Sequence, residues 1–222
     1  LLATQTERPE PFSSFEATQD DPVERSQAIA DYVSGRYLAG PDKGPLVTVD
    51  AGEDDKAALP GVQQTLAVGS SPPGVVSYEY GDILFYRMCG SASDCGLGPD
   101  QDRATYGPLL ARQARELALY GLKYVPEAAF VIVILPPGFI TGPDPANLPK
   151  AVHLYRRKDL EDDLDRPIAE TLPGPVPTPS TLTPAQASEF DDREASARYT
   201  MDSGVDAANT LNVYTLTPPP PG

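Results

Sequence analysis

Apolar side chains with a helical period predict a first helix over residues 22–38. Its apolar stripe consists of Ile29, Val33 and Tyr37. Asp21 suits the N-cap, and Pro22 suits the first helical position, where the N–H that proline lacks would be unpaired anyway. Glu24, three residues after Asp21, matches a capping box. Gly40-Pro41 ends the pattern.

A second and clearer helical pattern covers residues 105–124. Small and apolar residues recur along it at helical spacing: Leu110, Ala114, Leu117, Gly121 and Tyr124. Pro108 fits in the first turn and would break a helix that started much earlier. The apolar run Phe130–Leu135 follows, and a continuous run bounded by prolines is typical of a strand buried on both faces. With the strand that precedes the helix, the pattern predicts a strand–helix–strand crossover.

The clearest strand pattern runs from Val75 to Met88. Gly81-Asp82 interrupts it, and these two residues suit the turn of a hairpin. Such a hairpin would pair Tyr78 with Phe85 and Tyr80 with Ile83 across the two strands. The alternative is one long strand with a glycine bend. Shorter strands are predicted at residues 46–49, 64–68, 152–156, 197–201 and 211–216, the last two as a C-terminal hairpin.

Proline punctuates the chain, with 26 residues among 222. Five of them fall within residues 173–184, which predicts an extended linker. The expected parts are an N-terminal arm over 1–16, an α/β core over 17–170, a proline-rich linker over 171–189, a C-terminal hairpin docked on the core over 190–217 and a proline-rich tail over 218–222. The fold class is α+β (mixed α/β): a mixed, mostly antiparallel sheet of five to seven strands with two or three packed helices.

The net charge of the chain excludes more classes of partner than any sequence motif does. The net charge is −15, from 32 acidic and 17 basic side chains. Such a surface repels phosphate, so we expect no nucleic-acid partner and no adhesion to an anionic membrane. Solubility explains the acidic surface most simply, and a cationic partner is the alternative.

The two cysteines are six residues apart. Small and polar residues separate Cys89 from Cys95, so the pair is expected to close a short disulfide loop. Two free thiols, or a metal or redox role, are the alternatives, although the single His153 cannot complete a common zinc site without carboxylates. A structural disulfide implies an oxidising compartment. No apolar run reaches the length of a transmembrane helix, and because the chain starts at Leu1 we expect a signal peptide or membrane anchor upstream.

Tests for catalytic motifs leave little. Gly96-Leu-Gly98 lies between a strand and a helix but lacks the third glycine of a dinucleotide loop, and nearby aspartates would repel phosphate. His153 lies in a predicted strand and is interpreted as an edge or sheet-surface residue rather than a general base. No serine lies in a G-x-S-x-G or S-x-x-K motif. The sequence indicates no cofactor.

Two charged clusters remain as candidate sites. The acidic loop offers carboxylates for a hard cation such as calcium: Asp50, Glu53, Asp54 and Asp55. The only run of three basic residues, Arg156, Arg157 and Lys158, would bind an anionic ligand or partner, or pair with the acidic residues that follow it. Four tyrosines on predicted strands would line a face that binds a protein or packs under a helix: Tyr78, Tyr80, Tyr86 and Tyr155.

The resulting hypothesis is a non-enzymatic extracytoplasmic domain, secreted or membrane-tethered, that acts through contacts with a protein partner. It rests on the predicted disulfide, the acidic and proline-rich composition and the missing catalytic set. The alternative is a carboxylate-based hydrolase that uses a divalent cation, because abundant acidic side chains can hide a catalytic pair from sequence inspection.

Overall fold

The computed structural model describes residues 12–52, 63–68, 74–78, 82–140, 148–205 and 211–218. Its helices are α1 (Pro22–Ser34), α2 (Arg103–Tyr124), α3 (Glu161–Leu164), α4 (Ile168–Thr171) and α5 (Pro184–Glu194), with 3-10 turns η2 (Arg157–Asp159) and η3 (Ala195–Ala197). Its strands are β1 (Thr48–Ala51), β2 (Gln63–Val68), β3 (Gly74–Tyr78), β4 (Ile83–Cys89), β5 (Phe130–Ile134), β6 (Lys150–Arg156), β7 (Arg198–Val205) and β8 (Leu211–Thr217).

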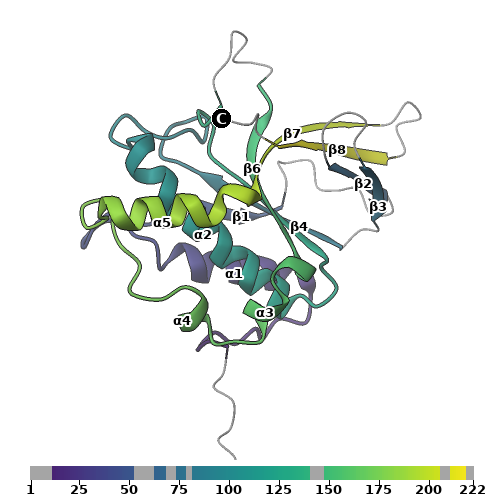
Figure 1. The fold of residues 1–222 in the computed structure, drawn as a ribbon, viewed down its shortest axis with the longest axis horizontal. Coiled ribbons are helices and arrows are strands. Elements are labelled where there is room, and N and C mark those ends of the chain that lie inside the picture. The colour runs from purple at the N-terminus through teal and green to yellow at the C-terminus, as the bar shows by residue number, and fades with distance from the viewer. Residues whose placement is uncertain are drawn as a thin grey trace, which may run out of the picture.

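These strands form one sheet in the order β1-β4-β5-β6-β7-β8-β2-β3 (Figure 1). Only the β4–β5 and β2–β8 pairs are parallel, and the other five neighbouring pairs are antiparallel. The predicted α+β class and the mixed, mostly antiparallel sheet are therefore confirmed. The sheet is wider than the five to seven strands expected, since every segment with a strand pattern found a place in it.

Both helices predicted from the apolar period form where local signals begin them. The Asp21 carboxylate accepts hydrogen bonds from the N–H groups of Val23 and Glu24, at 2.8 and 3.0 Å, and Pro22 occupies the first position of α1. Helix α1 ends at Ser34, earlier than expected. Asp102 caps α2, so this helix starts slightly before Thr105 and carries Pro108 in its second turn.

The predicted crossover is confirmed, because β4 and β5 are parallel neighbours joined by α2. All five residues of β5 are buried, as expected for a strand covered on both faces. Helix α2 approaches the sheet closely at Gly121, where a Cβ would lie 3.2 Å from the Tyr86 hydroxyl oxygen.

The predicted hairpin between residues 75 and 88 is wrong. Strand β3 pairs with β2, where Tyr78 aligns with Gln64, whereas β4 lies between β1 and β5 and aligns Phe85 with Ile132. Tyr80 and Gly81 lie outside the described residues. The alternative of one long strand is also wrong, because β3 and β4 occupy different parts of the sheet. Alternating polarity fixes which face a residue takes, but it does not choose the neighbouring strand.

The C-terminal hairpin is confirmed. Strands β7 and β8 pair antiparallel, and the hairpin joins the main sheet through β6 on one side and β2 on the other. The proline-rich linker before it is not shown. Val176 and Leu182 pack against the core, and Thr183 begins α5 with a capping box that the sequence analysis missed.

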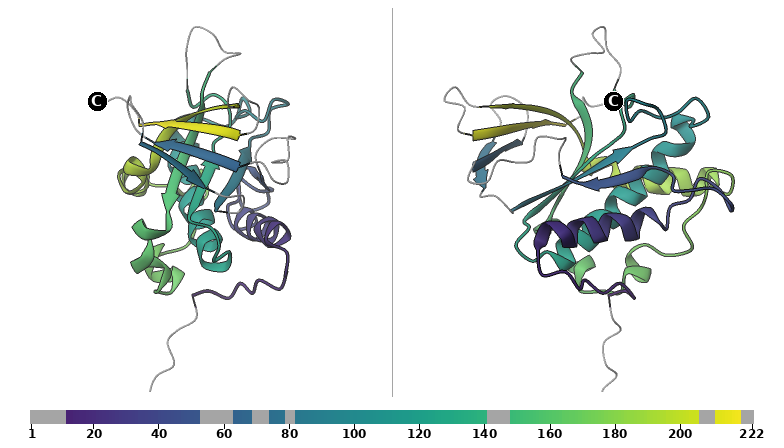
Figure 2. Two further views of the ribbon diagram at one scale, coloured as in Figure 1. Left: turned by 90° about the vertical axis from the view of Figure 1, so that its right-hand side faces the viewer. Right: turned by 180° about the vertical axis from the view of Figure 1, so that it is seen from behind.

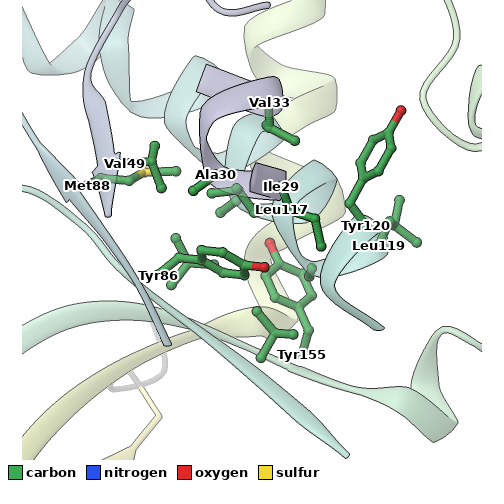
Figure 3. Packing of buried hydrophobic residues seen from close by; sticks show 14 of the residues in the cluster. Ile29, Ala30, Val33, Val49, Tyr86, Met88, Leu117, Leu119, Tyr120 and Tyr155 are labelled. Atoms are coloured by element: carbon green, nitrogen blue, oxygen red, sulfur yellow. The ribbon is translucent and has the colours of Figure 1, made fainter. Parts of the chain in front are cut away.

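Two apolar cores lie on the two faces of the sheet. The core on the helix side joins α1 and α2 to side chains of β4, β5 and β6, including Tyr86 and Tyr155 (Figure 3). On the other face, Phe85 of β4 contacts Tyr214 of β8 with ring centroids 4.9 Å apart, although β5, β6 and β7 lie between these strands. The sheet therefore curls over its own second core, and Figure 2 shows β2, β3, β7 and β8 turned away from the helices.

The edge strand β1 is closed by a side chain from α1. The Gln27 side-chain oxygen accepts the N–H of Ala51 at 2.9 Å, and its side-chain nitrogen lies 3.4 Å from the carbonyl oxygen of Val49. One amide group thus makes the two hydrogen bonds that a neighbouring strand would make.

Candidate functional site

Helix α2 is buried on almost every side, so the charged side chains that it carries need partners inside the protein. Arg112 is 3% exposed and Glu116 is fully buried, and the side-chain amide of the fully buried Gln113 has no hydrogen-bond partner among the described residues. Burying a charge is costly unless it is paired and hydrogen-bonded. The side chains that pair with α2 therefore form the buried polar clusters that are candidates for a functional site.

The first set of partners, the Glu116 cluster, consists of Arg36, Tyr37, Arg112 and Glu116. The Tyr37 hydroxyl donates to Glu116 Oε2 at 2.8 Å and accepts from Arg112 Nη1 at 2.9 Å. Arg36 Nε lies 3.1 Å from Glu116 Oε1. Burial, reinforced by the charge of Glu116, raises the pKa of Tyr37 well above its ordinary value, so this tyrosine stays protonated. Two arginines thus neutralise one fully buried carboxylate.

The second set, the Glu194 cluster, consists of Arg115, Tyr155, Asp163 and Glu194. Glu194 is 1% exposed; its Oε1 accepts from Arg115 Nη1 at 3.3 Å, and its Oε2 accepts from the Tyr155 hydroxyl at 2.8 Å. Arg115 also pairs with Asp163 at 2.5 Å. Burial raises the pKa of Glu194 despite the positive charge of Arg115. The cluster joins α2, α3, β6 and the end of α5.

His153 is buried beside this cluster, which corrects the interpretation of an edge or surface histidine. Its strand β6 lies between β5 and β7, and the side chain is 2% exposed. The His153 Nδ1 atom lies 3.3 Å from the Tyr155 hydroxyl. Burial and the positive charge of Arg198 lower the pKa of His153 to about 3. The imidazole is therefore neutral at physiological pH, where a general base would need a pKa closer to 7.

A shallow depression of about 130 Å³ opens at the outer end of the Glu194 cluster, between β6, η2, α5 and η3. Three arginines from three elements line it: Arg115 of α2, Arg156 of β6 and Arg193 of α5. We call it the arginine depression. The Arg156 and Arg193 side chains are 31% and 32% exposed, so their guanidinium groups are accessible at its rim. Asp159 lies 3.9 Å from Arg156, and Glu189 pairs with Arg193 at 2.9 Å.

The structure separates the three basic residues of the predicted anion site. Arg156 lines the arginine depression, whereas Arg157 donates to the carbonyl oxygens of Ala128 and Val125 at 2.9 and 3.0 Å and so supports the turn before β5. Lys158 is exposed and does not line the depression. Arg115 and Arg193 were missed because neither stands near the basic run in sequence. From the sequence, Arg115 could only be placed on a face of α2 other than the apolar stripe.

The acidic loop gives no assembled cation site in the part of the chain that can be described. Asp50 lies on β1, and Glu53, Asp54 and Asp55 lie outside the described residues. Among described residues, no three histidine, cysteine, aspartate or glutamate side chains are grouped to hold a metal ion.

The disulfide between Cys89 and Cys95 is confirmed, with Cα atoms 4.3 Å apart. The glycines beside it serve the packing of the loop. A Cβ on Gly90 would lie 2.2 Å from the Gly96 carbonyl oxygen, and the Gly98 N–H donates to Gln101 Oε1 at 2.7 Å. Tyr86 and Tyr155 are buried on the helix side of the sheet (Figure 3), so these two pack under helices as the second reading of the tyrosines predicted.

No protein-family model, curated protein or solved structure matches this chain. Within the described ranges, every helix is too short or too polar to cross a membrane.

Proposed function

We propose that this chain is a non-enzymatic extracytoplasmic domain, secreted or membrane-tethered, that acts through contacts with a protein partner. The observation that carries the proposal is the arginine depression of a chain of net charge −15, where the partly exposed Arg156 and Arg193 stand at the rim. Arg115, Glu194 and Asp159 also line it, and Arg115 is already paired with Glu194. The disulfide between Cys89 and Cys95 supports the oxidising compartment, because such bonds are rare in the reducing cytosol.

The chemistry of the depression favours a carboxylate from the partner. Guanidinium groups bind carboxylates through charge-assisted, often bidentate hydrogen bonds. A volume of about 130 Å³ suits one acidic side chain or a chain terminus rather than a large organic ligand. The net charge of −15 repels acidic proteins at long range, so the partner surface around that carboxylate should be neutral or basic.

Buried polar groups near the depression support a binding role rather than catalysis. Glu194, which lines the depression, is held by Arg115 and Tyr155, and His153, whose ring contacts Tyr155, is neutral and buried. Several contacts hold each of these groups in one position, so they give the binding surface a rigid support.

Affinity capture with a matched pair of variants tests the proposal. Arg156→Ser removes a rim arginine whose nearest carboxylate is 3.9 Å away, and Lys158→Ser removes an exposed charge two residues further on, outside the depression. We expect a protein from the extracytoplasmic fraction to be retained by the native chain and by Lys158→Ser and lost from Arg156→Ser. Equal retention by all three chains would show that the arginine depression does not bind the partner. Free thiols at Cys89 and Cys95 in native material would contradict an oxidising compartment.

A carboxylate-based hydrolase that uses a divalent cation is the second candidate. One observation favours it: Glu194 borders the depression, and its raised pKa is a property of general acids. Chromogenic esters, glycosides and phosphate esters, assayed with and without Ca²⁺ and Mg²⁺, test this candidate. Hydrolysis that is lost in Glu194→Gln would favour it, and inactivity together with a cation-independent melting temperature would dismiss it.

A further inference from the structure

The segment before α1 is held on the protein in the manner of a bound peptide. Residues 12–20, here called the N-terminal segment, form no helix or strand, yet they run along the ends of α1 and α2. Figure 2 shows this segment leading into α1 along the side of the molecule away from the sheet. The sequence alone predicts only an arm without periodicity over residues 1–16.

Two phenylalanines three residues apart provide the apolar anchors. They contact three tyrosines from α1 and α2, here called the tyrosine groove: Tyr32, Tyr120 and Tyr124. Phe12 meets Tyr120 edge-on at 5.5 Å between ring centroids, and Phe15 meets the same ring edge-on at 5.6 Å. Lys123 Nζ lies 5.4 Å from the centre of the Phe12 ring. Edge-to-face aromatic pairs stabilise a contact beyond the area that they bury.

The backbone of the N-terminal segment is bound as well as its side chains. The Tyr124 hydroxyl donates to the Phe15 carbonyl oxygen at 2.9 Å, and the Ile168 N–H donates to the Phe12 carbonyl oxygen at 2.8 Å. Arg25 donates to the carbonyl oxygens of Gln19 and Asp20 at 2.8 and 2.9 Å. These donors belong to the body of the protein, and hydrogen bonds to the main chain together with an aromatic-lined groove are ways in which domains hold extended peptides.

The segment also covers apolar surface that would otherwise be exposed. Tyr120 is fully buried, and both of its edge-on contacts with phenylalanine come from the N-terminal segment. Removal of the segment would leave adjacent tyrosine rings facing water, and an exposed aromatic patch of this kind favours association.

We propose that the tyrosine groove is a binding site for extended Phe-x-x-Phe segments, which residues 12–20 fill within one chain and which the same residues of a second copy fill between chains. We assign the groove to a second copy of this chain, because every copy carries residues 12–20 and these residues make the same contacts whichever copy supplies them. Exchange of such a terminal segment makes a dimer without any new interface chemistry. The proposal is independent of the arginine depression and of the partner proposed for it.

A peptide titration on the full chain tests the groove. The double variant Phe12→Ser/Phe15→Ser removes the internal anchors, and the probe is a fluorescent peptide with the sequence of residues 12–20. We expect the variant to bind this peptide at least about tenfold more tightly than the native chain, whose own segment competes at a high effective concentration. A peptide that carries serine at both phenylalanine positions should not bind. A folded variant that binds the peptide no better than the native chain does would overturn the proposal.

A second measurement keeps the proposal falsifiable if the double variant fails to fold. Phe15→p-benzoylphenylalanine in the otherwise native chain cross-links on illumination to the groove that holds it. With isotope-labelled and unlabelled chains mixed, cross-links between the two kinds of chain should increase with protein concentration. Cross-links confined to single chains at every concentration up to the millimolar range would refute exchange with a second copy.

Discussion

The helix-covered face and the opposite face of the sheet bury side chains of different kinds. On the opposite face the core of described residues is entirely hydrophobic: Ile83, Phe85, Phe130, Ile132, Ile134, Val152, Leu154, Met201, Tyr214 and Leu216. The helix side also buries the charged groups Arg112, Glu116 and Glu194, together with the neutral His153. The sheet therefore separates two cores. On the opposite face apolar packing holds the side chains in place, whereas on the helix side hydrogen bonds and ion pairs also hold them.

This difference shows where the chain has room for specific interactions. A core without buried charges tolerates hydrophobic substitutions that preserve volume. A buried polar network must keep each donor with its acceptor, because an orphaned charge costs far more than a lost contact. The helix side is also where the polar groups reach the surface, at the arginine depression. The two faces should therefore respond differently to substitution, pH and loss of a surface charge.

The largest effect is expected from Glu116→Gln. The variant leaves Arg112 buried beside Tyr37 without its carboxylate, and removal of one partner from a buried ion pair costs about 3–5 kcal/mol. Urea denaturation should show this decrease in the free energy of unfolding. The control is Glu189→Gln, which breaks an ion pair whose carboxylate side chain is 54% exposed and should cost less than about 1 kcal/mol. Similar losses for the two variants would show that the buried network of the helix side contributes no more to stability than an exposed ion pair does.

On the opposite face, Ile132→Ala should cost about 3 kcal/mol. Ile132 is fully buried in β5, and the variant loses both the transfer free energy of the deleted groups and the packing around the resulting cavity. Ile132→Val should cost about 1 kcal/mol in the same denaturation experiment, because a single methylene is removed. A loss that did not increase with the deleted volume would argue against a core held by packing alone.

Acidification should weaken the helix side through His153. Its pKa is about 3 in the folded chain and near 6.5 in the unfolded chain, so only the unfolded chain binds a proton between these values. The contribution is fully present above pH 6.5 and is lost as the pH falls toward 3. Between pH 7 and pH 5 the free energy of unfolding should fall by about 2 kcal/mol, following about 1.4 kcal/mol per pH unit.

His153→Gln isolates this contribution. Glu194, whose folded pKa is raised, acts in the opposite direction: its contribution is present at low pH and is lost as the pH rises through its folded pKa. Because Glu194 is present in both proteins, it cancels in the difference between them. The variant should therefore lose less stability than the native chain between pH 7 and pH 5. Equal losses would show that His153 does not resist protonation in the folded state.

The smallest effect on stability is expected from Arg156→Ser. Its guanidinium is partly exposed and its nearest carboxylate, Asp159, is 3.9 Å away, so the free energy of unfolding should change by less than about 1 kcal/mol. A thermal melt checks this value. A small change in stability with a complete loss of partner capture would assign Arg156 to binding rather than to folding.

Local signals explain the parts of the fold that the sequence predicted. Asp21 and Pro22 begin α1, and the apolar run of β5 identifies a strand covered on both faces, because each signal is contained within a few neighbouring residues. The pairing of β3 with β2 depends instead on contacts between distant segments. An alternating strand such as β4 fits several neighbours equally well, so the sequence favoured the nearest one and was wrong.

The candidate site was predictable only in part, for the same reason. Arg156 belonged to a visible basic run, and the disulfide followed from the short spacing of its cysteines. Arg115 and Arg193 reach the depression because α5 packs against α2. Helix α5 covers the end of the segment interpreted as linker (171–189) and the start of the segment interpreted as a hairpin (190–217), so no helix was expected there. The burial of His153 depended on β7 as the neighbour of β6, which no local pattern indicated.

The amide of Gln27 bears on how the protein avoids fibrous aggregation. An open strand edge is a template on which further chains can stack, and β1 is an edge strand. Because Gln27 engages the backbone of Ala51 and Val49, an incoming strand would first have to displace a side chain anchored in α1. Self-assembly from β1 would therefore have to break the two hydrogen bonds of the Gln27 amide before a new strand could pair there.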